Sequence, residues 1–216
     1  MKETINSSGA AVKPAKFFTV RNMAFIAVMA ALICVAGPFA VPMPGLVPIS
    51  LATFAVYLAG GLLGTKKGTV AVLIYVLLGA VGLPVFSGGA GGFAKLFGVT
   101  GGYIIGYIPC ALLTGLFVDL FFKKGAVKSL SGKHGFDLVT GWLKAVWAVP
   151  AGMVLGTVLC YAFGTVWFII ARGVTLEVAV ASCVIPFLAG DAIKIVCATA
   201  ITIALRDRLA AIMAQS

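Results

Sequence analysis

Two opposite charges stand three residues apart in an otherwise uncharged, apolar stretch near the end of the chain. Asp191 and Lys194 are the charged side chains within residues 178–205. On a helix this spacing places both on one face, where they can contact each other. Each charge costs roughly 2.5–3.5 kcal/mol at the centre of a membrane helix. The pair therefore predicts either a site for a ligand or ion, or an internal salt bridge that fixes helix packing.

A second candidate feature is the glycine-rich segment from Ser87 to Tyr103. Its glycines, Gly91 and Gly92 among them, let a backbone approach a ligand closely or adopt positive φ angles. The segment lacks the G-x-G-x-x-G spacing of dinucleotide-binding loops. It is either a ligand-binding loop or a flexible outer loop. The proline-rich segment 38–48 is a candidate lid for the same site, or merely a stiff turn.

The remaining reactive side chains predict neither catalysis nor a metal site. The five cysteines lie inside apolar runs without metal-type spacing, and we interpret them as small apolar side chains. His134 stands alone in a basic segment and is expected to be solvated. The sequence contains no P-loop motif and no set of serine, histidine and aspartate suited to catalysis. We therefore expect no enzyme activity, no cofactor and no metal.

The elements that position these side chains are membrane helices. Of 216 residues, 62% are hydrophobic and 10% are charged, against about 25% charged in a soluble domain. Residues 22–65 form an uncharged run of 44 residues, about twice the ~20 residues that cross a bilayer. A net charge of +10 would raise the question of nucleic-acid binding in a soluble protein. The apolar composition instead makes the lipid bilayer the expected partner, and we expect no nucleic acid.

The apolar segments predict an all-α membrane protein with six transmembrane helices. Prolines clustered from Pro38 to Pro48 split the first uncharged run, because proline cannot continue a helix. The expected helices cover residues 22–37, 49–64, 69–83, 101–122, 142–170 and 179–205. The expected domains are a cytoplasmic arm at 1–21, one six-helix transmembrane domain at 22–205 and a cytoplasmic tail at 206–216.

The distribution of cations predicts the orientation of these helices. Thirteen of the 16 Lys and Arg residues fall in the terminal segments, in the connector with Lys66 and Lys67, or in the connector between the fourth and fifth helices. The opposite connectors carry Lys95 and Arg172. Because cations in short loops stay in the cytoplasm, we expect both termini there and residues 84–98 outside. The expected location is a bacterial or archaeal cell membrane.

The first expected helix carries a stripe of small residues. Ala24, Ala27 and Ala31 fall at i, i+3 and i+7, on one helix face. In lipid, such a stripe lets a second helix backbone approach closely. It is either a docking surface for a partner protein or part of the packing inside the bundle.

Several short motifs together point to a known family. They are Val47-Pro-Ile-Ser-Leu-Ala-Thr-Phe54, Gly60-Gly-Leu-Leu-Gly64, Gly88-Gly-Ala-Gly-Gly92, Gly98-Val-Thr-Gly-Gly-Tyr103, Tyr161-Ala-Phe-Gly-Thr-Val-Trp167 and Gly190-Asp-Ala-Ile-Lys194. Over most of the chain, from Met29 to Lys194, they resemble the BioY proteins, whose patterns include V-P-I-T-x-Q-T-F, GGxGG…GPTGGY and G-D-x-x-K. Ser50, Ala52 and Val99 depart from these patterns. BioY proteins are the biotin-specific substrate-binding (S) components of energy-coupling-factor (ECF) transporters.

The resemblance implies the ECF S-component fold and high-affinity capture of biotin from outside the cell. It also implies two partners: a transmembrane coupling (T) subunit, which would dock on the alanine stripe, and a pair of ABC ATPases. The ureido ring of biotin has two N–H donors and one carbonyl acceptor, so Asp191 can accept and Lys194 can donate. The implied substrate-binding residues are Asp191, Lys194, Trp167, Gly91, Gly92, Phe93, Tyr103, Lys95 and Phe86.

Two kinds of contact are expected besides the ion pair. The apolar bicyclic ring of biotin would pack against Trp167, Phe86 or Phe93. Lys95 would either face the valerate carboxylate or be solvated. Trp167, with Tyr161, could instead belong to a belt of aromatic residues at the membrane interface.

Two alternative functions remain open at this point. The departures at Ala52 and Val99 are compatible with an S component for a different small vitamin. A structural membrane protein without a ligand is the other alternative, and it predicts that neutralising Asp191 changes no ligand-dependent property.

Overall fold

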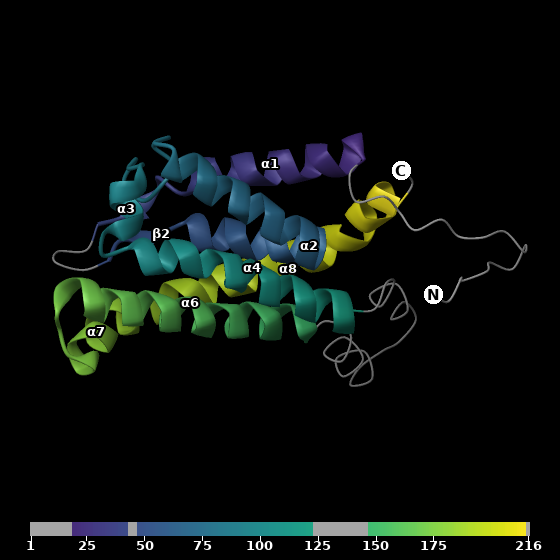
Figure 1. Ribbon diagram of the computed structural model, residues 1–216. Coiled ribbons are helices and arrows are strands. Elements are labelled where there is room, and N and C mark those ends of the chain that lie inside the picture. Colours follow the sequence, from purple (N-terminus) through teal and green to yellow (C-terminus); the bar gives the residue numbers. More distant parts are fainter. Residues whose placement is uncertain (1–18, 43–46, 123–146, 215–216) are drawn as a thin grey trace, which may run out of the picture.

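The computed structural model describes residues 19–42, 47–122 and 147–214. Over these ranges the chain is almost entirely helical, and the long helices lie with their axes roughly aligned in one bundle (Figure 1). The elements are α1 (Val20–Ala36), β1 (Ala40–Val41), β2 (Ile49–Ser50), α2 (Ala52–Ala80), α3 (Phe93–Phe97), α4 (Gly101–Phe121), α6 (Ala148–Arg172), α7 (Leu176–Cys183) and α8 (Ile185–Ala214). Helix α2 packs against α1, α4 and α8, and α6 packs against α4.

The first helix forms close to its predicted range of 22–37. The Thr19 hydroxyl accepts a hydrogen bond from Asn22 N at 3.3 Å and caps the start of α1. The helix ends at Ala36, because Pro38 lacks the N–H that another helical hydrogen bond needs. The proline-rich segment then forms β1, which pairs antiparallel with β2.

Helix α2 covers most of the two predicted helices 49–64 and 69–83, joined by a sharp turn, but it begins at Ala52 and ends at Ala80, since residues 49–50 form β2. Gly64 has φ 77° and ψ −176°, a conformation that residues with a side chain rarely adopt. The chain turns back there, so that a Cβ atom on Gly68 would overlap the Ala59 carbonyl oxygen. The predicted division is confirmed, but the connector is one glycine instead of a loop of several residues.

Helices α4 and α6 pack closely because glycines face their neighbours. A Cβ atom on Gly106 of α4 would lie 3.1 Å from Cys160 Cα, and one on Gly156 of α6 would lie 2.8 Å from the Cys110 carbonyl oxygen. Small residues permit this close approach in membrane proteins. Both helices agree with the predicted ranges 101–122 and 142–170, of which residues 142–146 lie outside the described part of the chain.

The prediction of one helix at 179–205 is wrong at its start. Helix α7 ends at Cys183, and Val184, with φ −121° and ψ −57°, separates it from α8. The break has a local cause, because Pro186 has no N–H to donate and its ring would clash with the preceding turn of a continuous helix.

The same prediction also ends too early. Helix α8 continues through the charged residues 206–208 to Ala214, so the segment expected as a cytoplasmic tail begins within a helix. Charged residues mark where a helix leaves the hydrocarbon, whereas helical hydrogen bonding continues until a residue interrupts it.

Within the described residues, four helices are long and apolar enough to cross a membrane: α2, α4, α6 and α8. Helix α1 is apolar but shorter, with 17 residues. The chain therefore has the fold of a multi-pass, helical membrane protein. One end of the bundle carries the start of α1, the Gly64 turn and the end of α8, and we call it the Gly64 end. The other carries β1, β2, α3 and α7, and we call it the strand end (Figure 1).

Candidate functional site

Asp191 and Lys194 form an ion pair near the start of α8. Lys194 Nζ lies 2.9 Å from Asp191 Oδ1, and the two side chains are 13% and 7% exposed for Lys194 and Asp191 respectively. The contact predicted from their spacing is confirmed. Such a buried pair is stable only if its remaining hydrogen-bonding positions are also occupied.

Three residues from other elements occupy those positions. Tyr161 on α6 donates its hydroxyl to Asp191 Oδ2 at 2.5 Å. Lys194 Nζ donates to the Ser50 carbonyl oxygen at 2.8 Å and to Thr53 Oγ1 at 3.0 Å. With Asp191 as the third acceptor, all three N–H donors of Lys194 are used. We call these five residues the ion-pair network; it joins α8 to α6, β2 and α2.

The chain around the start of α2 holds Ser50 and Thr53 in place for this network. Ser50 Oγ donates to the Gly37 carbonyl oxygen and accepts from Ala52 N, both at 3.0 Å. These bonds fix β2 against the end of α1 and hold it beside the first residue of α2. Thr53, in the first turn of α2, also lies with its Oγ1 3.4 Å from Asp191 Oδ1.

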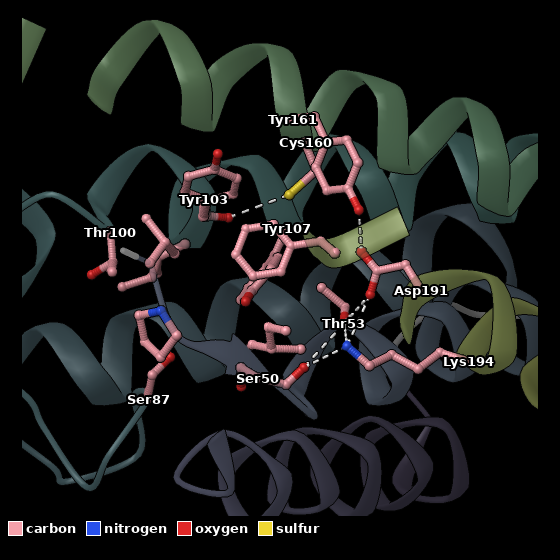
Figure 2. Close-up of a pocket in the computed structure, with 15 residues that line it drawn as sticks. Ser50, Thr53, Ser87, Thr100, Tyr103, Tyr107, Cys160, Tyr161, Asp191 and Lys194 are labelled. Carbon is pink, nitrogen blue, oxygen red and sulfur yellow. Dashed lines mark hydrogen bonds and ion pairs between the residues drawn. The ribbon is translucent and has the colours of Figure 1, made fainter. Parts of the chain in front are cut away.

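The ion-pair network forms one part of the wall of a cavity at the strand end of the bundle (Figure 2). The cavity has an empty volume of about 460 Å³, the open space at its mouth included. Its wall comprises Val47, Pro48, Ile49, Ser50, Thr53, Ser87, Thr100, Tyr103, Ile104, Tyr107, Cys160, Tyr161, Phe187, Asp191 and Lys194. Apolar and aromatic side chains with a few polar groups are typical of a binding site for a small organic molecule.

Comparison with known proteins assigns the family of the chain. Residues 7–211 match the model of the BioY family. The chain belongs to the BioY family. It is 33% identical over 186 residues to the biotin transporter BioY of Rhodobacter capsulatus, with 82% of this chain and 88% of that protein covered. It is 34% identical over 186 residues to the probable biotin transporter BioY of Pyrococcus horikoshii, with 86% of this chain and 95% of that protein covered.

A solved structure shares the fold. The crystal structure of the S-component for biotin from an ECF-type ABC transporter matches with a TM-score of 0.69 at 28% identity, over 87% of this chain and 91% of that chain. The BioY resemblance and the S-component fold expected from the sequence are thereby confirmed. Membership in this family of transport proteins also confirms that the chain is not an enzyme.

Three of the predicted substrate-binding residues lie in the cavity wall: Asp191, Lys194 and Tyr103. The Tyr103 hydroxyl donates to the Cys183 carbonyl oxygen at 3.2 Å and so ties α4 to α7. The Tyr103 ring lies edge-on to Phe187, with 6.4 Å between the ring centroids. Contact of these residues with a ligand stays a prediction.

The three predicted ring-packing residues lie outside the cavity wall. Trp167 Nε1 donates to the Gly98 carbonyl oxygen at 2.9 Å and holds the segment before α4 against α6. Phe86 is fully buried and packs edge-on against Tyr75, with 5.6 Å between the ring centroids. Phe93 is 63% exposed. Trp167 and Phe86 are therefore explained by packing contacts away from the cavity, and Phe93 lies at the surface.

Gly91, Gly92 and Lys95 also lie outside the cavity wall. A Cβ atom on Gly91 would overlap the Leu83 carbonyl oxygen, and Gly92, with φ 90°, donates its N–H to the Gly79 carbonyl oxygen at 2.7 Å. Close packing of this loop on the end of α2 therefore requires Gly91, whereas the positive φ angle favours glycine at Gly92. Lys95 lies half-buried in α3.

Most of the residues in the cavity wall are not among the substrate-binding residues predicted from the sequence. An interfacial belt is one of the interpretations that the sequence leaves open for Tyr161, whereas the hydroxyl of this residue belongs to the ion-pair network. Ser50 and Thr53 lie in a segment that matches a BioY motif, so a signal for both was present. Tyr107 follows Tyr103 by one helical turn, and residues at this spacing share a face.

The alanine stripe faces away from the bundle. Ala24, Ala27 and Ala31 are exposed, whereas Ile26 and Ile33 on the opposite face of α1 are buried. Among the described residues, the stripe therefore does not take part in packing inside the bundle. It is left as a surface that another helix can approach.

Proposed function

We propose that this chain is the S component of an ECF transporter and that it binds biotin in the cavity beside Asp191 and Lys194. The observation that carries the proposal is the ion-pair network in the wall of a largely apolar cavity. The network offers carboxylate acceptors beside ammonium and hydroxyl donors. Biotin has the complementary arrangement, because its apolar bicyclic ring carries a ureido group with two N–H donors and one carbonyl acceptor.

Ligand binding then proceeds by exchange of hydrogen bonds, because the network is fully occupied without a ligand. A ureido N–H replaces the Tyr161 hydroxyl on Asp191 Oδ2. The ureido carbonyl accepts one of the three Lys194 N–H donors. Hydrogen bonds to an ionised partner are roughly twice as strong as neutral ones, so the ligand gains strong bonds while neither charge is left unpaired.

The end of the proline-rich segment 38–48 and the start of β2 border this site. Val47, Pro48 and Ile49 lie in the cavity wall, and β2 is held to the bundle by the short pairing with β1. We infer that this segment must move for biotin to enter. Residues 43–46 lie outside the described part of the chain.

In the orientation that the distribution of cations favours, the cavity lies on the outer side of a bacterial or archaeal cell membrane. The Gly64 end carries Arg21, Lys66, Lys67 and Arg206, and it is the cytoplasmic end in this proposal. Six crossings result if the two arms of α2 are counted separately, with α1, α4, α6 and α8 as the others. Both termini are then cytoplasmic. The cations of residues 2–16 and 123–144, which also contribute to this orientation, lie outside the described ranges.

Labelling of single cysteines in a cysteine-free background tests the orientation. An impermeant thiol reagent added to whole cells should modify Glu177→Cys, an exposed position in α7 at the strand end. Arg208→Cys, exposed at the Gly64 end, should react only after the cells are opened. The reverse pattern would contradict the orientation.

The exposed alanine stripe is the proposed docking surface for the T subunit, which works with a pair of ABC ATPases. Replacing Ala27 by Trp should block close helix approach and abolish energised uptake, while biotin binding by the isolated chain survives. Val158→Trp, at an exposed position on α6, is the matched control and should retain both properties. Unimpaired uptake by the Ala27 variant would contradict this docking surface.

Competitive equilibrium binding tests the ligand. We expect the purified, detergent-solubilised chain to bind biotin saturably at one site, without displacement by an excess of thiamine or riboflavin. Displacement of biotin by another vitamin at lower concentration would favour the alternative of an S component for that vitamin. Absence of binding to any of them would favour a structural membrane protein.

A further inference from the structure

The short helix α3 exposes two phenylalanine side chains on one face. Phe93 is 63% and Phe97 is 72% exposed, and residues four apart share a face of a helix. Lys95 follows Phe93 by a rotation of about 200° around the helix axis, so that α3 has an apolar side and a charged side. Neither phenylalanine belongs to the cavity wall. The proposed function therefore does not explain why these two rings are exposed.

Contacts before, within and after α3 hold this helix against the bundle. Gly92, directly before α3, donates its N–H to the Gly79 carbonyl oxygen at 2.7 Å. The carbonyl oxygen of Gly98, directly after α3, accepts from Trp167 Nε1 at 2.9 Å. Leu96 packs against the buried core. The two phenylalanines are therefore exposed on a helix that is fixed in place, and they point away from the bundle.

Helix α3 lies at the level where a membrane-spanning helix leaves the hydrocarbon. Helix α4, with 21 residues, is about 31 Å long at 1.5 Å per residue, close to the ~30 Å thickness of the hydrocarbon core. Its first residue, Gly101, donates its N–H to the Gly98 carbonyl oxygen at 3.0 Å. Figure 1 shows α3 at the strand end of the bundle. A bilayer that α4 spans therefore has its boundary close to α3.

A stripe of exposed apolar side chains on the second arm of α2 leads to the same boundary. Leu73, Leu77 and Val81 are exposed, and their spacing of four residues places them on one helix face. On a helix that crosses a membrane, such a face is a lipid contact. A Cβ atom on Gly91, just before α3, would overlap the Leu83 carbonyl oxygen. The start of α3 therefore lies beside the end of this lipid-facing stripe.

We propose that α3 is an interfacial anchor, whose two phenylalanine rings insert between the headgroups and acyl chains of the bilayer. Amphipathic helices at this boundary bury their apolar face about 5–10 Å deep, and contact with acyl chains removes the rings from water. Phospholipid is the expected occupant because the neighbouring stripe of α2 already faces it. In the proposed orientation the anchor lies in the outer leaflet, but the contact itself does not depend on biotin.

The anchor also sets the level of the cavity in the membrane. Ser87 and Thr100, on either side of α3 in the sequence, both lie in the cavity wall. The segment that joins them is then held at the lipid boundary. The cavity consequently lies near the headgroups, where a polar ligand reaches it from water without crossing the hydrocarbon.

Collision measurements on nitroxide spin labels test the anchor. Phe97→Cys is labelled in a cysteine-free chain and reconstituted into vesicles of phosphatidylcholine and phosphatidylglycerol. Oxygen concentrates in hydrocarbon whereas a nickel chelate stays in water, so the ratio of the two collision rates reports the depth of the label. Leu73→Cys, in the stripe of α2, is the control for hydrocarbon. Glu177→Cys, at an exposed position in α7, is the control for water.

We expect the oxygen-to-nickel ratio of labelled Phe97→Cys to lie several-fold above that of Glu177→Cys and below that of Leu73→Cys, at a depth of about 5–10 Å. A ratio equal to that of Glu177→Cys would place α3 in water and overturn the proposal. Low collision rates with both reagents would show that protein covers α3, and would overturn it as well. If Phe97→Cys does not fold, Phe93→Cys on the same face is measured with the same expected outcome. Each of these results is obtained without biotin, so the proposed function is tested separately by titration.

Discussion

Each end of the bundle contains an ion pair between an aspartate and a basic side chain, and the two pairs differ in their surroundings. At the strand end, Asp191 and Lys194 are 7% and 13% exposed and lie in the wall of a cavity. At the Gly64 end, Arg206 Nη2 lies 2.5 Å from Asp119 Oδ1, and the Asp119 side chain is 42% exposed. Neither Asp119 nor Arg206 belongs to the wall of the cavity in Figure 2.

The pair at the Gly64 end stabilises the sharp turn in α2. Asp119 Oδ2 accepts hydrogen bonds from Thr65 N at 2.8 Å and from Thr65 Oγ1 at 2.7 Å. It thereby caps the second arm of α2 directly after Gly64. Arg206 also donates to the Gly61 carbonyl oxygen, so α8 is tied to the same turn.

The comparison shows that a charged pair in an apolar chain does not by itself identify a binding site. Both pairs are completed by hydroxyl and backbone partners. The difference is that the partners of Asp191 and Lys194 border empty volume, where a ligand can take over their hydrogen bonds. The partners of Asp119 are backbone and side chain of one turn, which a ligand cannot replace without unfolding it.

The largest expected effect is the loss of biotin affinity when the buried pair is broken. Lys194→Met should weaken binding by about 1.5–3 kcal/mol or more, because a charge-assisted hydrogen bond is lost and Asp191 keeps an uncompensated charge. Isothermal titration measures the affinity. Arg206→Met, which breaks the more exposed pair, is the control and should leave biotin affinity unchanged. Equal losses of biotin affinity in the two variants would contradict the proposed difference between the strand end and the Gly64 end.

A smaller effect is expected on stability when the Gly64 turn is altered. Gly64→Ala should lower the free energy of unfolding by about 1–3 kcal/mol, because alanine is strained at this positive φ. Its Cβ atom would also lie 2.5 Å from Asp119 Oδ1. Gly173→Ala, at φ 64° with no atom within 4 Å of the added Cβ, carries the φ strain alone and should cost less. Thermal unfolding in detergent compares the two, and a larger loss for Gly173→Ala would contradict this explanation of the turn.

The smallest effect is expected for the charge of Asp119. Asp119→Asn should lower the free energy of unfolding by about 1 kcal/mol or less, since salt bridges of exposed side chains contribute little. The same unfolding assay, repeated at high salt, should show the difference shrinking as the charges are screened. A loss of several kcal/mol in the free energy of unfolding would contradict this expectation, because the exposed pair would then contribute as much as a buried one.

The sequence predicts the helices and the ion pair well because both signals are local. Uncharged runs mark the spans, and a spacing of three brings Asp191 to Lys194. The sequence does not predict that Phe86 packs against Tyr75 or that Tyr161 reaches Asp191, because these contacts join residues far apart in the chain. The sequence also does not predict the helix break at Val184. The apolar composition continues through this residue, and it suggests one helix even though a proline follows closely.

The glycine-rich segment shows the same limit in another form. Its motif correctly indicates the family, but Gly91 packs closely against Leu83 and Gly92 donates its N–H to Gly79. A motif can therefore be specific for a binding protein without every residue in it contacting the ligand. The wall residue Thr100 lies within the same motif, and its unpaired hydroxyl becomes visible only in the folded chain.

The most direct test of the account is biotin titration of three proteins side by side: the unaltered chain, Asp191→Asn and Asp119→Asn. Both substitutions neutralise one aspartate of an ion pair at nearly constant shape. We predict that Asp191→Asn binds biotin roughly 10- to 100-fold more weakly, while Asp119→Asn binds it as tightly as the unaltered chain. Normal biotin affinity in a folded Asp191→Asn protein would contradict the assignment of the site to this cavity.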